Sequence, residues 1–259
     1  TPPSTAAGTT YYRVVISNTG NGCGSVTSNT ATVVINNDIS ITTQPADITE
    51  CIGGTTQLSV VATGGVGTLT YQWESATLLA GPYTAIVGAT SSSYTPPSTA
   101  AGTTYYRVVI SNTGNGCGSV TSNTATVVIN NDISITTQPA DITECIGGTT
   151  QLSVVATGGV GTLTYQWESA TLLAGPYTAI VGATSSSYTP PSTAAGTTYY
   201  RVVISNAGNG CGSITSNPAT VIINNDISIT TQPADITECI GGTTQLSVVA
   251  TGGVGTLTY

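Results

Sequence analysis

The chain repeats a unit of 94 residues. Residues 95–188 restate residues 1–94 letter for letter, and residues 189–259 begin a third copy that differs from the second at four positions, namely Ala207, Ile214, Pro218 and Ile222. A period of 94 is too long for helical or leucine-rich solenoid units, which are not stable alone, and it matches one small self-contained domain. We therefore predict a tandem array of domains, with a function that belongs to the array.

Composition excludes several kinds of partner. The chain has three Arg, eleven acidic residues, no His and a formal net charge of -8. Because a nucleic acid presents closely spaced negative charges, no nucleic-acid partner is expected. No apolar run approaches the about 18 residues of a membrane span, so no membrane insertion is expected, and no signal peptide opens the chain. We expect the sequence to be a window on a longer filament.

The cysteines recur in pairs, one pair for each repeat. Their spacings alternate between 28 and 66 residues, at Cys23, Cys51, Cys117, Cys145, Cys211 and Cys239. An even and regular set favours disulfides and an oxidising, extracellular setting. A zinc site would require closely spaced Cys pairs or His, and the sequence has neither. Buried free thiols remain the alternative.

The residue pattern within one repeat indicates strands. Alternating apolar runs of five to eight residues are separated by Gly, Pro and Asn, which is typical of an antiparallel sandwich. From Asp38 onward, strands are predicted at 39–43, 46–51, 57–63, around 69–73, at 83–87, 91–94, 102–112 and 124–130. In the run 102–112, the side chains of Tyr106, Val108 and Ile110 are expected to point inward. No segment has the pattern of a helix.

Two of these strands resemble those of an immunoglobulin-like sandwich. Trp73 would be the core Trp of the third main strand, and Tyr106 resembles the tyrosine corner of that fold. Val60 and Val108 stand where antibody domains carry their bridging Cys. The predicted fold is all-β, with tandem immunoglobulin-like antiparallel β-sandwiches in a linear filament. The predicted core residues are Trp73, Tyr106, Trp167 and Tyr200.

The resemblance also sets the domain boundaries. Residues 38–131 and 132–225 would be complete domains. Residues 1–37 would be the C-terminal part of one domain, and residues 226–259 the N-terminal part of another. We expect neither fragment to close a core.

A narrower resemblance rests on five short motifs. They are Cys-x-Gly-Gly, Tyr-Gln-Trp, Ser-Ser-Tyr-Thr-Pro-Pro, Ala-Gly-Thr-Thr-Tyr-Tyr and Gly-Cys-Gly-Ser. Together they resemble the immunoglobulin-like repeats of giant adhesins of gliding Bacteroidota, the SprB type, exported by type IX secretion. This resemblance implies a cell-surface filament that acts as a stalk, with further copies of the repeat and the outer-membrane or gliding machinery as partners. The alternative is a spacer or carbohydrate-binding array of a secreted polysaccharide-degrading enzyme.

The sandwich topology restricts how the cysteines can pair. Cys51 would lie at the turn where the second strand, 46–51, ends, and Cys117 would lie in the turn Asn115-Gly116-Cys117-Gly118 at the opposite end. Strands of about eight to ten residues, at about 3.3 Å per residue, separate the two ends by roughly 25–30 Å. A disulfide needs Cα atoms within about 7 Å of each other. Head-to-tail stacking would instead pair Cys51 with Cys211, leaving Cys23, Cys117, Cys145 and Cys239 for copies outside this sequence. A bond within one domain, free thiols and bonds between chains stay open.

Catalytic residues are scarce. Without His or Lys, general-base chemistry has few candidates, so no enzyme is expected. A carboxylate pair among Asp47, Glu50 and Glu74 remains formally open. Asp47 and Glu50 are more simply solvated edge charges, and Glu74 is placed to pair with Arg107 at the surface.

Two weaker binding hypotheses complete the analysis. The linker residues Asn131 and Asp132 offer oxygen ligands to calcium, although a turn explains them equally well. No other cofactor is expected. Outward Thr, Ser and Asn, with Tyr83 and Tyr105, could contact surface glycans in many weak copies, while strand propensity alone also explains the Thr.

Overall fold

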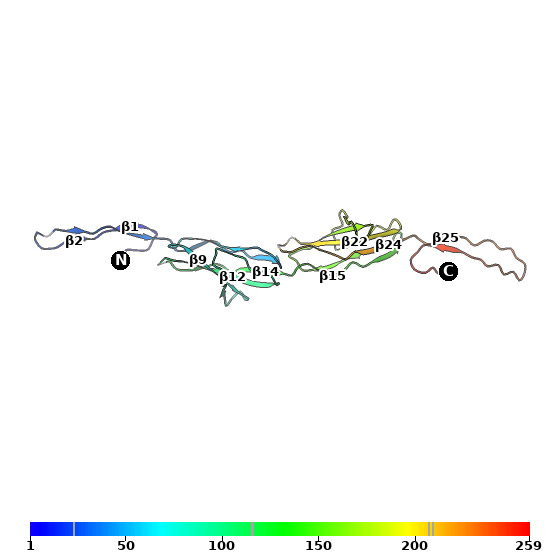
Figure 1. The fold of residues 1–259 in the computed structure, drawn as a ribbon, viewed down its shortest axis with the longest axis horizontal. Coiled ribbons are helices and arrows are strands. Elements are labelled where there is room, and N and C mark those ends of the chain that lie inside the picture. The colour runs from blue at the N-terminus through cyan, green and yellow to red at the C-terminus, as the bar shows by residue number, and fades with distance from the viewer. Residues whose placement is uncertain (23, 115–116, 207, 209) are drawn as a thin grey trace. The chain divides into compact units, whose positions relative to one another are not determined.

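The computed structural model describes residues 1–22, 24–114, 117–206, 208 and 210–259. Within them, all regular elements are β-strands (Figure 1), which confirms the all-β prediction. The chain divides into two compact units, Thr1–Thr49 with Thr55–Ile129, and Glu50–Gly54 with Asn130–Tyr259. No helix among the described residues has the length and apolar character needed to cross a bilayer.

The first complete repeat forms a two-layered sandwich. Its larger sheet has the strand order β10-β9-β12-β14-β6, with β13 beside β12. The other layer pairs β5 with β8 and β7 with β11. The strands are β5 (Ser40–Thr43), β6 (Ile48–Cys51), β7 (Leu58–Ser59), β8 (Val61–Thr63), β9 (Leu69–Ala76), β10 (Thr84–Ala85), β11 (Ser93–Tyr94), β12 (Gly102–Asn112), β13 (Val120–Thr121) and β14 (Ala125–Asn130).

The longest strand, β12, organises this sandwich. It pairs antiparallel with β9 from Tyr105 opposite Ala76 to Asn112 opposite Leu69, and with β14 on its other side. Side chains alternate across a strand, so Tyr106, Val108 and Ile110 share one face and are 4%, 0% and 0% exposed. The predicted inward set is confirmed.

The first strand of each repeat changes sheet at a proline. In the second repeat, β15 (Ser134–Thr137) pairs with β18 (Val155–Thr157), and after Pro139 the chain continues as β16 (Ile142–Cys145), which pairs parallel with β24 (Ala219–Asn224). Proline has no N–H to donate and interrupts a ladder at this point. The switch places the cysteine of β16 next to the C-terminal end of β24.

The remaining strands of the second repeat follow the first. They are β17 (Leu152–Ser153), β19 (Thr164–Ala170), β20 (Thr178–Ala179), β21 (Ser187–Tyr188), β22 (Gly196–Ser205) and β23 (Ile214–Thr215). The larger sheet has the order β16-β24-β22-β19-β20, with β23 beside β22. The two complete repeats are tandem immunoglobulin-like sandwiches, as predicted.

The sequence prediction missed some details of the strands. The predicted strand 57–63 is divided into β7 and β8 at Val60, whose amide donates to the carbonyl of Ser92 (3.0 Å). The predicted strands 83–87 and 91–94 shorten to two residues each, and β13 was not expected. These segments are short, and their pairing depends on neighbours distant in sequence.

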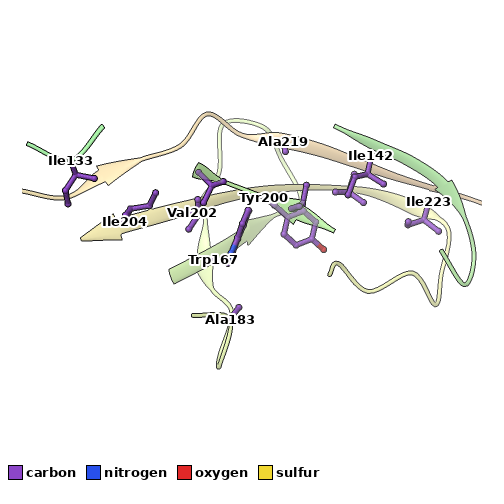
Figure 2. Close-up of a cluster of buried hydrophobic side chains, with 12 residues drawn as sticks. Ile133, Ile142, Trp167, Ala183, Tyr200, Val202, Ile204, Ala219 and Ile223 are labelled. Atoms are coloured by element: carbon purple, nitrogen blue, oxygen red, sulfur yellow. The ribbon is translucent and has the colours of Figure 1, made fainter. Parts of the chain in front are cut away.

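The core of the second sandwich is built around Trp167 (Figure 2). The ring centroid of Trp167 lies 6.1 Å from that of Tyr188, and the Tyr188 centroid lies 5.7 Å from that of Tyr200. The indole N–H donates to the carbonyl of Ser185 (2.9 Å), so the buried polar atom is satisfied. Val154 and Val202 are 4% and 0% exposed. Trp73 and Tyr106 take the same places in the first sandwich, so all four predicted core residues are buried.

The described residues of the two terminal segments form antiparallel strand pairs. At one end, β1 (Gly8–Tyr12) pairs with β4 (Ala31–Ile35) and β2 (Val15–Ile16) with β3 (Val26–Thr27). At the other end, β25 (Ser228–Thr231) pairs with β26 (Val249–Thr251). Tyr12 is 36% exposed, whereas its counterpart Tyr106 is 4% exposed. These segments hold only part of the strands that bury such residues in a complete repeat.

Candidate functional site

Cys51 is the last residue of β6 and opens a tight turn, Glu50–Gly54, which we call the Cys51 turn. The amide of Gly54 donates to the carbonyl of Cys51 (3.0 Å), and the amide of Ile52 donates to the carbonyl of Asn130 at the end of β14 (3.1 Å). Gly53 has φ +84°, a conformation that favours glycine. The Cys-x-Gly-Gly motif therefore presents the Cys51 side chain at a fixed place beside β14.

Cys211 lies in the loop that follows β22. The described residues of this Cys211 loop are Asn206, Gly208 and those from Gly210 to Ser213. The Oδ1 atom of Asn206 accepts from the amides of Gly208 (2.8 Å) and Val160 (3.2 Å). The amide of Cys211 donates to the carbonyl of Gly208 (3.1 Å). One asparagine side chain thus holds the loop and ties it to the turn that contains Val160.

A disulfide joins Cys51 to Cys211. The two Cα atoms are 4.9 Å apart and 160 residues apart in the chain. Cys51 is 0% exposed, and its turn groups with the residues of the second repeat in one compact unit. The pair is the one that the sequence analysis derived from topology, and the bond connects one repeat to the next along the chain.

The other four cysteines were predicted to pair with copies of the repeat beyond this sequence. Cys117 and Cys145 are half-buried free thiols, and Cys239 is an exposed free thiol. Cys23 lies outside the described residues. Pairing of these four with further copies stays a prediction.

Glu50 corrects one sequence interpretation. It was expected to be a solvated edge charge, but it is 1% exposed. Asp47 is exposed as expected, and its Oδ1 atom accepts from the amide of Thr126 (2.7 Å). The interpretation of Glu50 was wrong because edge position alone does not reveal what covers a strand end. No signal in the sequence of one repeat could have shown this burial.

A charged cluster lies on the outer face of each larger sheet. Nε of Arg107 donates to Oε2 of Glu74 (2.7 Å), as the sequence predicted. The guanidinium carbon also lies 4.1 Å from the ring centroid of Tyr83. The Tyr83 hydroxyl donates to the carbonyl of Leu79 (3.0 Å), so this Tyr, one of the glycan-contact candidates, braces the hairpin between β9 and β10. Arg201, Glu168 and Tyr177 repeat the arrangement.

The calcium candidates Asn131 and Asp132 are exposed. The carbonyl of Asn131 accepts from the amide of Gly159 (2.8 Å), which lies in the bend between β18 and β19, so this oxygen already has a hydrogen-bond donor. Among the described residues, no group of three or more His, Cys, Asp or Glu is placed to hold a metal ion. Calcium binding at these residues stays a prediction.

Solved structures similar to this chain are immunoglobulin-domain arrays. Sidekick-1 immunoglobulin domains 1–5 match at 19% identity and a TM-score of 0.48, over 97% of this chain and 54% of theirs. A three-domain titin structure matches at 12% identity and a TM-score of 0.48, over 83% of this chain and 75% of its own. Drosophila OTK extracellular domains 3–5 match at 15% identity and a TM-score of 0.44, over 85% of this chain and 72% of theirs.

This chain spans about half the length of the Sidekick-1 structure. No curated protein sequence matches it. A family model described as Domain of unknown function (DUF8696) matches residues 41–131 and again residues 135–225. These two matches follow the two complete sandwiches and cover more than half of the sequence. The chain therefore belongs to the DUF8696 family and contains two tandem copies of its domain.

Proposed function

We propose that this chain is part of the stalk of an extracellular, cell-surface adhesin filament. The observation that carries the proposal is the Cys51–Cys211 disulfide, which connects consecutive repeats across 160 residues. Near-identical copies of one sandwich supply length, and a covalent bond between neighbouring copies supplies resistance to pulling. Domains of one chain are mobile by default when their contacts are small, so a bond at the connection limits that mobility.

The load path supports the mechanical role. Strands β7–β14 of the first sandwich and β15–β22 of the second lie between Cys51 and Cys211 in the sequence. Tension that enters before Cys51 and leaves after Cys211 passes through the sulfur bridge and bypasses these strands. Unfolding the strands inside this loop would not lengthen the chain, so the load falls on the strands outside it, β5 and β6 of the first sandwich and β23 and β24 of the second.

The chemistry of the bond supports an extracellular location. Disulfides persist in oxidising compartments and are rare where cytosolic reductants act. A low content of charged residues and a Thr-rich surface suit a passive spacer. A role in gliding motility, export by type IX secretion and weak contacts with surface glycans are the finer parts of this proposal, and they rest on the motif resemblance.

The proposal is tested by locating this chain on cells and by deleting repeats from its gene. Antibodies raised against this chain should label filaments on intact cells, and electron microscopy should show filaments that shorten when repeats are deleted from the gene. Surface attachment or cell movement should weaken in the shortened strain. Label found only on a secreted protein that degrades polysaccharide would overturn the stalk and favour the spacer array.

A further inference from the structure

Two turns with the same sequence differ in burial. Glu50 and Cys51 are 1% and 0% exposed, whereas Glu144 and Cys145, in the turn Glu144–Gly148 that we call the Cys145 turn, are only half-buried. Because the residues are identical, the difference comes from what covers them. The Cys211 loop lies against the Cys51 turn.

The contact between that loop and the Cys51 turn is a close backbone approach. A Cβ atom added at Gly210 would lie 2.5 Å from the amide nitrogen of Gly54 and 2.8 Å from the carbonyl oxygen of Cys51. These are backbone atoms, which cannot move aside as a flexible side chain can. Gly210 also has φ +75°, a conformation that L-residues with side chains rarely adopt. Only glycine fits there.

The contact has two parts, the turn and the cysteine loop. Each part also forms at a place where the other part is absent. In the Cys145 turn, the amide of Gly148 donates to the carbonyl of Cys145 (3.0 Å) and Oε2 of Glu144 accepts from the amide of Thr150 (3.2 Å). The hydroxyl of Ser192 donates to the carbonyl of Gly148 (2.6 Å). The turn is therefore built before anything covers it.

The described residues of the loop that holds Cys117 are also held in place without a covering copy. Oδ1 of Asn112 accepts from the amides of Gly114 (3.0 Å) and Val66 (3.3 Å), and its Nδ2 donates to the carbonyl of Cys117 (3.2 Å). This repeats the role of Asn206. Two rigid, complementary surfaces lose little conformational entropy when they meet.

We propose that the Glu-Cys-Ile-Gly-Gly turn is a docking site for the cysteine loop of a further copy of the repeat, and that docking precedes the disulfide. The Cys51 turn holds its partner loop, and the Cys145 turn is the same site for the next copy. Docking places two thiols together, and a small disulfide oxidant such as oxidised glutathione then completes the joint. It accepts two electrons and two protons, leaving as two thiols while one sulfur–sulfur bond forms in the protein.

This inference rests on the proposed stalk, in which every repeat meets another copy. Its test uses the full chain with a single cysteine, so that no disulfide can form. One variant keeps only Cys51, and a second keeps only Cys145, with the other five replaced by Ser. The rate of alkylation by iodoacetamide is measured by mass spectrometry. Trp fluorescence verifies that both variants are folded.

We expect Cys51 to be alkylated at least about tenfold more slowly than Cys145, because a docked loop must open before the reagent enters. Adding Gly210→Ala should raise the Cys51 rate towards that of Cys145. Gly212→Ala is the matched control, since a Cβ there meets nothing within 4 Å, and it should leave the rate slow. Equal rates for Cys51 and Cys145 in folded protein would overturn docking, yet would leave filament labelling on cells unchanged.

Discussion

Single residues decide where the reactive sulfur atoms lie. Asn206 accepts two amide hydrogens through one oxygen, and this fixes the backbone from which Cys211 projects. Asn112 makes the equivalent bonds in the first sandwich. Both side chains hold backbone groups of the cysteine loops, so both are positioning residues. Their role explains why an amide side chain stands at the end of the longest strand in each repeat.

Replacement of Asn206 by Ala tests this role. The variant removes the oxygen that accepts from the amides of Gly208 and Val160. We therefore expect the free energy of unfolding to fall by about 1–2 kcal/mol. The yield of the Cys51–Cys211 disulfide after refolding in a glutathione buffer should fall, as measured by peptide mapping. Asn112→Ala is the matched control, which should cost similar stability while leaving that yield unchanged. A normal yield in Asn206→Ala would show that the loop needs no such support.

Buried tyrosines predict how stability depends on pH. Burial, with a smaller effect from nearby Tyr94, raises the pKa of Tyr106, while a hydrogen bond with Thr104 partly opposes the shift. Burial likewise raises the pKa of Tyr200. The folded state therefore holds these protons more tightly than the unfolded state, and stability is lost as pH rises above the ordinary tyrosine value of about 10.

Urea midpoints measured between pH 8 and pH 11 should show this loss, after the free thiols have been alkylated. The double variant Tyr106→Phe and Tyr200→Phe should lose less stability over the same range, because phenylalanine has no proton to release. An identical pH dependence in the variant and the parent would mean that other groups cause the alkaline loss.

At the scale of elements, the edge strand that carries each cysteine is held by side chains as well as by its ladder. Oδ1 of Asp141 accepts from the amide of Thr220 (2.7 Å), and Oε1 of Gln138 accepts from the amide of Asn217 (2.9 Å). Both bonds join the segment around β16 to the segment around β24. They fix the start of β16, the strand whose other end leads into the Cys145 turn.

Asp141→Ala should loosen this edge while the sandwich stays folded. We expect a loss of roughly 0.5–1.5 kcal/mol for one exposed hydrogen bond, together with faster hydrogen exchange of the β16 amides. The β19 and β22 amides should keep their protection. Asp132→Ala removes the same charge from the exposed segment between β14 and β15 and serves as the control. Uniformly faster exchange across all strands would instead indicate global destabilisation.

How far the sequence predicts these elements depends on length and burial. The strand 102–112 was predicted with the bounds of β12 because its strict alternation, ending in Ser-Asn, marks one half-buried surface. The two-residue strand β13 has no pattern of its own. The burial of Glu50 was beyond reach, because it depends on a loop 160 residues away. The pairing of Cys51 with Cys211 was accessible only through the fold, which places the cysteines of one repeat at opposite ends.

For the whole molecule, the disulfide changes both folding thermodynamics and mechanics. Closing a loop of 160 residues removes chain entropy from the unfolded state worth about 5 kcal/mol in the loop-closure model. The two sandwiches then share one covalent constraint. Reduction should therefore affect both repeats, although each core contains no disulfide of its own among the described cysteines.

Force spectroscopy on the chain held at its two ends distinguishes a covalent bond between Cys51 and Cys211 from a noncovalent contact. With the bond intact, the 160 residues between Cys51 and Cys211 cannot extend. After reduction, full unfolding should release roughly 530–580 Å of additional contour length, at 3.3–3.6 Å per residue. Cys211→Ser in oxidising buffer should give the longer trace, and Cys239→Ser the shorter one, because Cys239 is a free thiol. Equal lengths before and after reduction would mean that load passes through the sandwiches rather than around them.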